Sequence, residues 1–127
     1  MSFSSAVRVV VVDDKDPFRL AARSVIESTR GFELVAEARS GEELLENLDD
    51  FDPQVVLMDV HMPGMGGIEA TRRLRAKRSD VLVVLCSTYG AEDLPFDSLG
   101  VGVYVNKQDL VPSLIRRLWD EHEARAR

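Results

Sequence analysis

Five polar side chains in this sequence stand at the ends of apolar runs, where a fold could gather them. Asp13 and Asp14 follow VRVVVV, Asp59 follows VVLM, Ser87 follows VLVVLC, and Lys107 comes shortly after VGVYV. Short apolar runs rich in β-branched residues are typical of buried strands. If the strands are parallel, their carboxyl ends share one edge of the sheet, and three carboxylates, a hydroxyl and an ammonium would meet there.

Three neighbouring carboxylates favour a bound divalent cation, because each negative charge raises the pKa values of the other two. Oxygen ligands of this kind suit Mg²⁺ or Mn²⁺. A cation that leaves one carboxylate oxygen free, beside a lysine and a hydroxyl, is typical of a phosphoryl-transfer site. Asp59 is the expected nucleophile, since we expect the Pro- and Gly-rich loop that follows it (HMPGMGG) to leave it exposed.

Each of these residues also has an ordinary structural explanation. Asp13 and Asp14 could be turn and N-cap residues, Ser87 could simply end a strand, and Lys107 could be a solvated lysine. Their joint occurrence at the ends of four apolar runs favours the chemical interpretation.

The elements that must position these residues alternate along the chain. Five segments are predicted as strands: 7–12, 32–37, 55–58, 81–86 and 101–105. Helical patterns follow the strands, with one irregular connection between the fourth and the fifth. Apolar strands alternating with helices predict an α/β fold, a doubly wound parallel sheet with helices on both faces.

Capping signals place the first two helices. Asp16 and Pro17 are expected as N-cap and first helical position of a helix that stops before Gly31. Ser40 and Glu43 form a capping box for the next helix, and its apolar stripe is Leu44, Leu45 and Leu48.

A third helix is expected near 66–77, with an arginine-rich solvated face, and a last helix from about Asp109, with Pro112 in its first turn. Between the fourth and fifth strands, residues 89–100 leave room only for a short or irregular helix, which Pro95 interrupts.

Length and composition predict one ordinary globular domain over residues 1–127. Apolar residues make up 45% and charged residues 30%, and the formal charge of −6 argues against binding a nucleic-acid backbone or an anionic membrane. The lone Cys86 is expected in the core and fits a reducing cytoplasm. We identify neither a signal peptide nor a membrane-spanning run. Residues 120–127 lack apolar positions and are expected to fray or to begin a linker.

Four segments, VVDDKDPFR, LMDVHMPGMGG, VLCS and YVNK, together resemble the receiver domain of bacterial two-component response regulators, and most closely the LuxR/NarL type. The resemblance extends from Val7 to about Trp119. It implies a flavodoxin-like, five-stranded parallel sheet in the order 2-1-3-4-5. It also implies a signalling module that catalyses only its own phosphorylation and dephosphorylation, and is otherwise not an enzyme.

The resemblance assigns a role to each candidate residue. It makes Asp59 the phosphoacceptor and Asp13 and Asp14 the acidic pair that holds Mg²⁺ (or Mn²⁺) with Asp59. The His61 backbone carbonyl would be a further metal ligand, and Lys107 would bond the phosphoryl group. Ser87 would be the switch hydroxyl and Tyr104 the aromatic switch. The phosphoryl donor would be a sensor histidine kinase, and the receiver itself would be cytoplasmic. A homodimer on phosphorylation is possible, and DNA would be reached only through a helix-turn-helix domain that these 127 residues do not contain.

The sequence departs from the family pattern in two places. The spacing from Ser87 to Lys107 is shorter than is usual in the family, and Pro95 lies where a regular fourth helix would run. Thr88 stands where the family commonly has a smaller residue, and with His61 it could narrow access to an acyl phosphate. His61 could instead be an ordinary exposed loop histidine.

Two other interpretations remain open at this stage. A haloacid dehalogenase-like phosphatase would use Asp14 within Asp14-Lys15-Asp16, but it would leave Asp59 unexplained, and 101–127 offers no further acidic pair after a strand. A receiver-like interaction module that is never phosphorylated is the third possibility.

Overall fold

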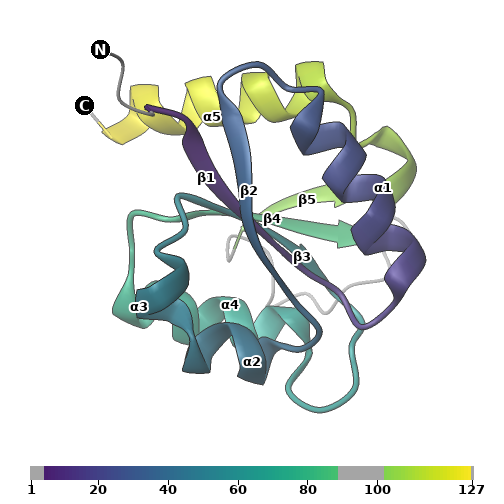
Figure 1. Cartoon of the computed structure of the whole chain (residues 1–127). Coiled ribbons are helices and arrows are strands. Elements are labelled where there is room, and N and C mark those ends of the chain that lie inside the picture. Colours follow the sequence, from purple (N-terminus) through teal and green to yellow (C-terminus); the bar gives the residue numbers. More distant parts are fainter. Residues whose placement is uncertain (1–4, 89–101, 127) are drawn as a thin grey trace.

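The computed structural model describes residues 5–88 and 102–126. Their centre is a five-stranded sheet in the order β2-β1-β3-β4-β5, in which every neighbouring pair is parallel (Figure 1). The strands are β1 (Val7–Val12), β2 (Phe32–Ala38), β3 (Val55–Asp59), β4 (Leu82–Ser87) and β5 (Val103–Asn106). The fold class expected from the alternating pattern, and the strand order implied by the resemblance, are confirmed.

Helices cover both faces of this sheet (Figure 1). The helices are α1 (Asp16–Glu27), α2 (Gly41–Glu46), α3 (Leu48–Phe51), α4 (Gly66–Lys77) and α5 (Pro112–Ala126), and a 3₁₀ helix covers Lys107–Asp109. One buried apolar cluster joins α1 and α5 to the sheet, and a second joins α2, α3 and α4 to the opposite face.

The valines of β1 show why the central strands β1, β3 and β4 are largely apolar. Val9 and Val11 belong to the cluster under α1 and α5, whereas Val10 and Val12 belong to the cluster under α2 and α4. All four are fully buried. Successive side chains of a strand point to opposite faces, so a strand covered on both sides must be apolar at every position. Polar functional side chains are therefore expected at the end of such a strand.

The first two helical segments differ from the expected boundaries. Lys15, not Asp16, is the N-cap of α1, and the Asp16 side chain pairs with Arg19 instead of capping the helix. Ser40 caps α2 as expected and accepts a 3.0 Å hydrogen bond from the Glu43 backbone N–H. The Leu44–Leu48 stripe is split between α2 and α3, because Asn47 turns its side-chain amide onto the Glu43 carbonyl at 2.9 Å.

The C-terminal helix also differs in its bounds. It begins at Pro112, because a proline disfavours helical backbone at the residue before it. Residues 120–126 are helical and belong to α5, where the sequence suggests a frayed tail or linker. Ion pairs one turn apart (Arg116–Asp120 at 3.7 Å and Arg117–Glu121 at 4.0 Å) favour the helical conformation. The short or irregular helix expected between β4 and β5 lies outside the described residues.

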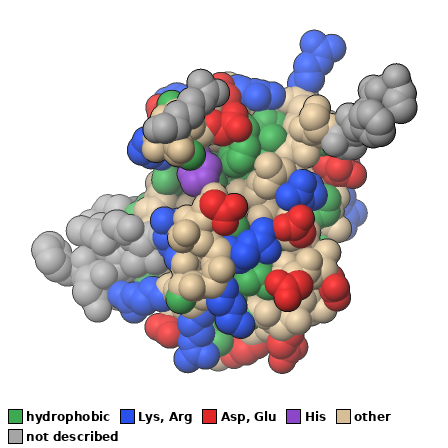
Figure 2. All heavy atoms as spheres, turned by 90° about the vertical axis from the view of Figure 1, so that its left-hand side faces the viewer, with side chains coloured by type: hydrophobic (Ala, Val, Ile, Leu, Met, Phe, Trp, Pro, Cys, Tyr) green, Lys and Arg blue, Asp and Glu red, His purple; other side chains and the backbone are tan. Residues whose placement is uncertain are grey.

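Charges on the described surface are largely mixed. Figure 2 shows acidic and basic side chains interspersed on the face that carries α3 and the chain termini. On α4, Arg72 and Arg73 both pair with Glu69, as expected for a solvated face. None of the helices within the described ranges has both the length and the apolar character that a membrane span requires.

Candidate functional site

Asp13 and Asp14 begin the loop that connects β1 to α1. Asp13 is fully buried, and its Oδ1 atom accepts a 2.7 Å hydrogen bond from the Lys15 backbone N–H. The Asp13 backbone N–H donates to the Ala38 carbonyl of β2 at 3.0 Å. This loop is therefore tied to the sheet at its first residue, which fixes where both carboxylates start.

Asp59 is the last residue of β3, and the glycines that follow allow the chain to turn away close to it. Gly66 has a positive φ of +77°. A Cβ atom on Gly67 would lie 2.1 Å from the Asp59 carbonyl oxygen, so only glycine allows α4 to begin so near the strand. The expectation that this loop leaves Asp59 exposed is wrong. The residue is 3% exposed, because Asp13 and Lys107 pack against its carboxylate.

Lys107 follows the edge strand β5 and contacts the carboxylates of both Asp13 and Asp59. Its Nζ atom donates to Asp13 Oδ2 at 2.9 Å and lies 3.3 Å from Asp59 Oδ1. The Nζ atom also lies 4.5 Å above the centroid of the Phe18 ring in α1. A cation over an aromatic face and between two carboxylates is held by electrostatic attraction from several sides.

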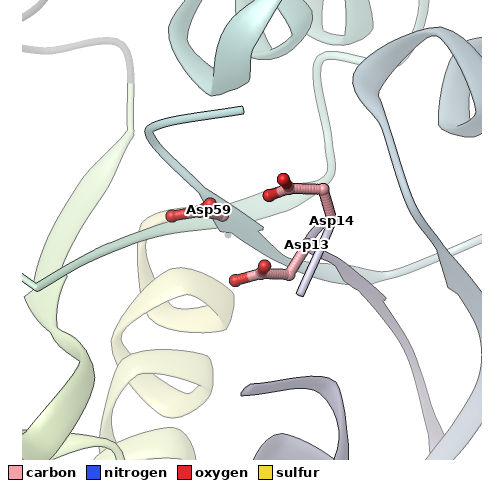
Figure 3. Close-up of side chains that lie close together, drawn as sticks. All are labelled: Asp13, Asp14 and Asp59. Atoms are coloured by element: carbon pink, nitrogen blue, oxygen red, sulfur yellow. The ribbon is translucent and has the colours of Figure 1, made fainter. Parts of the chain in front are cut away.

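The three carboxylates form one cluster (Figure 3). One oxygen from each of Asp13, Asp14 and Asp59 lies within 4.8 Å of the others. Asp14 Oδ1 is buried and accepts no hydrogen bond among the described residues, although Lys15 Nζ lies 3.5 Å away. A buried carboxylate oxygen left without a donor fits a site for a small, hard cation that oxygen ligands bind.

The surroundings of Asp59 shift its pKa in opposite directions. Burial and the neighbouring Asp13 carboxylate raise the pKa of Asp59, whereas Lys107 acts to lower it. Burial alone would lower the pKa of Lys107, but the hydrogen bond to Asp13 and the charges of Asp59 and Asp13 raise it in sum. The site therefore holds more negative than positive charge, and an added cation would relieve the imbalance.

Comparison with known proteins agrees with this geometry. The family model described as the response regulator receiver domain matches residues 9–114. The chain belongs to this family. Among relatives, the receiver is 41% identical over 96 residues to the response regulator GacA of Pseudomonas viridiflava, covering 76% of this chain and 45% of that protein. It is 33% identical over 103 residues to the response regulator UvrY of Escherichia coli K12, covering 80% and 47%.

A solved structure of similar sequence is the LuxR-family two-component response regulator from Aurantimonas sp. SI85-9A1. It has a TM-score of 0.78 to this receiver and is 29% identical, covering 91% of this chain and 87% of that one. The receiver therefore resembles LuxR/NarL-type regulators, as its motifs suggest. It spans less than half of the length of GacA and of UvrY.

The other candidate residues of the receiver differ in burial and in their place around the acidic cluster. Ser87 ends β4 and is buried, one residue beyond the Cys86 that pairs in register with Asp59, so it lies at the same edge of the sheet. His61 is exposed, and its backbone N–H lies 3.4 Å from Asp59 Oδ1. Tyr104 is half-buried in β5 and packs against the cluster under α4. Thr88 is exposed.

The thiol beside this edge is part of the core of the receiver. Burial raises the pKa of Cys86 to about 12. The thiolate, which is the nucleophilic form, is therefore scarce near neutral pH.

The phosphatase interpretation is not supported. Asp16 lies outside the acidic cluster: its side chain is 72% exposed and pairs with Arg19. Asp14 and Asp16 therefore do not face one reaction centre as a phosphatase D-x-D motif requires.

Three residues near the site do not stand out in the sequence. Phe18 lies beneath Lys107, Arg19 contacts the Asp13 backbone, and Glu42 accepts a 3.2 Å hydrogen bond from the Met65 backbone N–H in the loop after Asp59. Phe18 is unremarkable on an apolar helix face. The Asp16–Arg19 spacing of three residues in a first helical turn is the signal that could have drawn attention to Arg19.

Proposed function

We propose that this receiver acts in the cytoplasm and accepts a phosphoryl group on Asp59 from a sensor histidine kinase. The observation that carries the proposal is the meeting of Asp13, Asp14 and Asp59 with the Lys107 ammonium at the carboxyl edge of the sheet. An Asp59 oxygen would attack the phosphorus atom as the bond from phosphorus to the donor nitrogen breaks. The product is an aspartyl phosphate, and the kinase histidine recovers its imidazole.

Each neighbouring residue has a task in this reaction. Asp13, Asp14 and Asp59, with the backbone carbonyl of His61, would hold Mg²⁺ or Mn²⁺. When bound, the ion supplies positive charge to the phosphoryl oxygens. Lys107 already lies beside Asp59 and would pair with a phosphoryl oxygen, so the new negative charge would meet a cation on the protein side as well.

Phosphorylation would bias a two-state element at the same edge. Ser87 would donate to the phosphoryl group, and Tyr104 would move toward the space that Ser87 leaves. Reversing a strongly biased equilibrium needs about 5.5 kcal/mol of differential stabilisation. Several hydrogen bonds to a buried phosphoryl group, each about 1.5–3 kcal/mol when a charged group takes part, are sufficient.

The output would be control of transcription. The similarity to LuxR-family regulators, and the greater length of GacA and UvrY, support an output through a DNA-binding domain beyond these 127 residues. Homodimerisation on phosphorylation would couple the switch to that domain.

Incubation with acetyl phosphate and Mg²⁺ tests the phosphoacceptor. The wild type should gain the mass of one phosphoryl group, and Asp59→Asn should gain none under the same conditions. Asp49→Asn, at an exposed acidic residue of α3, is the matched control and should be modified like the wild type. Labelling of Asp59→Asn to the wild-type level would overturn the assignment. No labelling of either folded protein would favour the unphosphorylated interaction module.

A further inference from the structure

Arg19 is a charged side chain buried inside the fold, and the proposed reaction gives it no task. It is the fourth residue of α1 and is 8% exposed. A guanidinium stays charged and carries five N–H donors, so burying it is costly unless acceptors surround it. The acceptors around Arg19 therefore indicate what the residue does.

Those acceptors come from three separate segments. Arg19 Nη1 donates to the backbone oxygen of Asp13 at 2.7 Å, Nη2 pairs with the Asp16 carboxylate, and Nε lies 3.3 Å from Glu37 Oε1 in β2. The other Glu37 oxygen is held by Arg23, at 2.5 Å from Nη2. Arg19 thus joins the end of β1, the start of α1 and the neighbouring strand β2.

The contact with Asp13 is made to the backbone and leaves the carboxylate to other partners. Asp13 Oδ1 accepts from Lys15 N–H, and Oδ2 accepts from Lys107. The carbonyl that Arg19 holds belongs to the peptide between Asp13 and Asp14. Since a peptide unit is planar and includes the Cα atoms of both residues, holding its oxygen restricts how the Cα atoms that carry the two carboxylates can shift.

The charge of Arg19 is balanced within the same network. Asp16 and Glu37 pair with its guanidinium, and neither carboxylate belongs to the acidic cluster. Arg19 can therefore hold the loop without competing for the carboxylate oxygens that would bind a cation.

We propose that Arg19 is a positioning residue for a divalent cation at Asp13 and Asp14, and that Glu37 holds Arg19 in place. This inference rests on the proposed function, because it assumes that the acidic cluster binds such an ion. Loss of a group that orients metal ligands typically lowers metal affinity about 10- to 100-fold.

Calorimetric titration of the chelator-treated full chain with Mn²⁺ tests the inference. We compare the wild type, Arg19→Met, Arg19→Lys and Arg23→Met. Arg19→Met keeps an unbranched apolar stem but removes all three polar contacts, and should bind about tenfold more weakly or worse. Arg19→Lys keeps the charge without the planar fork and should fall between Arg19→Met and the wild type. Arg23→Met loses two exposed hydrogen bonds to Glu37 Oε2 and keeps the pair between Arg19 and Glu37 Oε1, so its affinity should match the wild type.

A urea midpoint for each variant separates positioning from a merely structural role. A residue that only stabilises the fold would lower the midpoint and leave the Mn²⁺ affinity of the folded protein unchanged. Wild-type affinity in folded Arg19→Met overturns the inference. If Arg19→Met does not fold, wild-type affinity in Arg19→Lys overturns it instead. Absence of Mn²⁺ binding by the wild type would contradict the proposed function itself, which distinguishes the two failures.

Discussion

Asp59 is buried beside a like charge, and this has a consequence for stability that is separate from any reaction. Burial and Asp13 raise its pKa above the ordinary value of 3.8, in spite of Lys107. Between the unfolded and the folded pKa, the folded state holds more protons than the unfolded state. The free energy of unfolding therefore falls as pH rises through that interval. Ionisation of Asp59 therefore lowers the stability of the folded state.

Asp59→Asn removes this destabilising ionisation. In the presence of a chelator, the variant should melt on the order of a few degrees above the wild type at pH 7. The difference should shrink toward zero as pH falls below about 4, where Asp59 is protonated in the unfolded state too. Thermal melts across this pH range measure it, and equal melting temperatures at pH 7 would contradict the argument.

Asp52→Asn provides a control of opposite sign. A hydrogen bond from Arg78 lowers the pKa of Asp52, so its ionised form is the stabilising one, and that stability is lost as pH falls through its folded pKa. This variant should therefore melt at or below the wild-type temperature at pH 7. Asparagine tolerates the left-handed backbone at this position, where φ is 45°, so the substitution isolates the charge.

Among the described glycines, Gly67 at the start of α4 has the least room for an added Cβ atom. Gly67→Ala would place a methyl group 2.1 Å from the Asp59 backbone carbonyl oxygen, and neither atom can rotate away because the backbone fixes both positions. We expect a loss of about 3 kcal/mol in urea unfolding, at the upper end for overpacked sites.

Gly66→Ala is the matched comparison one residue earlier. The nearest atom to its added methyl group would be the Val60 oxygen at 3.8 Å, so the main cost is the positive φ of +77°, about 1–2 kcal/mol. If Gly67→Ala proved as stable as Gly66→Ala, the close approach of α4 to β3 would be incorrect.

The elements themselves could be largely predicted, because strands buried on both faces leave an unmistakable pattern. Each of the five apolar runs is a strand, and the Ser40 cap and the 66–77 helix lie where the sequence places them. The break at Asn47 could not be predicted from apolar spacing, since Leu48 continues the stripe across it. It depends on one side-chain hydrogen bond to the Glu43 carbonyl.

The positions of the site residues in the fold could be predicted, but their burial and their contacts could not. Because the carboxyl ends of parallel strands share an edge, Asp13, Asp14, Asp59 and Lys107 could be expected together. That Lys107 would cover Asp59 depends on side-chain packing that no spacing rule contains. The burial of Arg19 could not be predicted for a related reason: charged residues on helices are usually exposed, and the Asp16–Arg19 spacing indicates an ion pair but not its burial.

For the whole molecule, cation binding should stabilise the fold, because the ligand cluster exists only in the folded chain. Mg²⁺ at about 100 times its Kd should add about 2.7 kcal/mol to the free energy of unfolding. Asp14→Asn should lose most of this gain, since Asp14 carries the buried oxygen without a donor. Asp49→Asn should keep it. A Mg²⁺ effect no larger than that of NaCl at equal ionic strength would argue against a specific site.

Asp13 and the ammonium that balances it are separated by 94 positions in the chain. During synthesis on the ribosome, β1 to β4 emerge first and can bring the acidic residues together before β5 exists. A nascent chain that stops short of β5 would hold two buried like charges without the cation that offsets them. Only a chain that extends past β5 supplies the ammonium that offsets these negative charges. Translation products that end before β5 should be less stable for that reason.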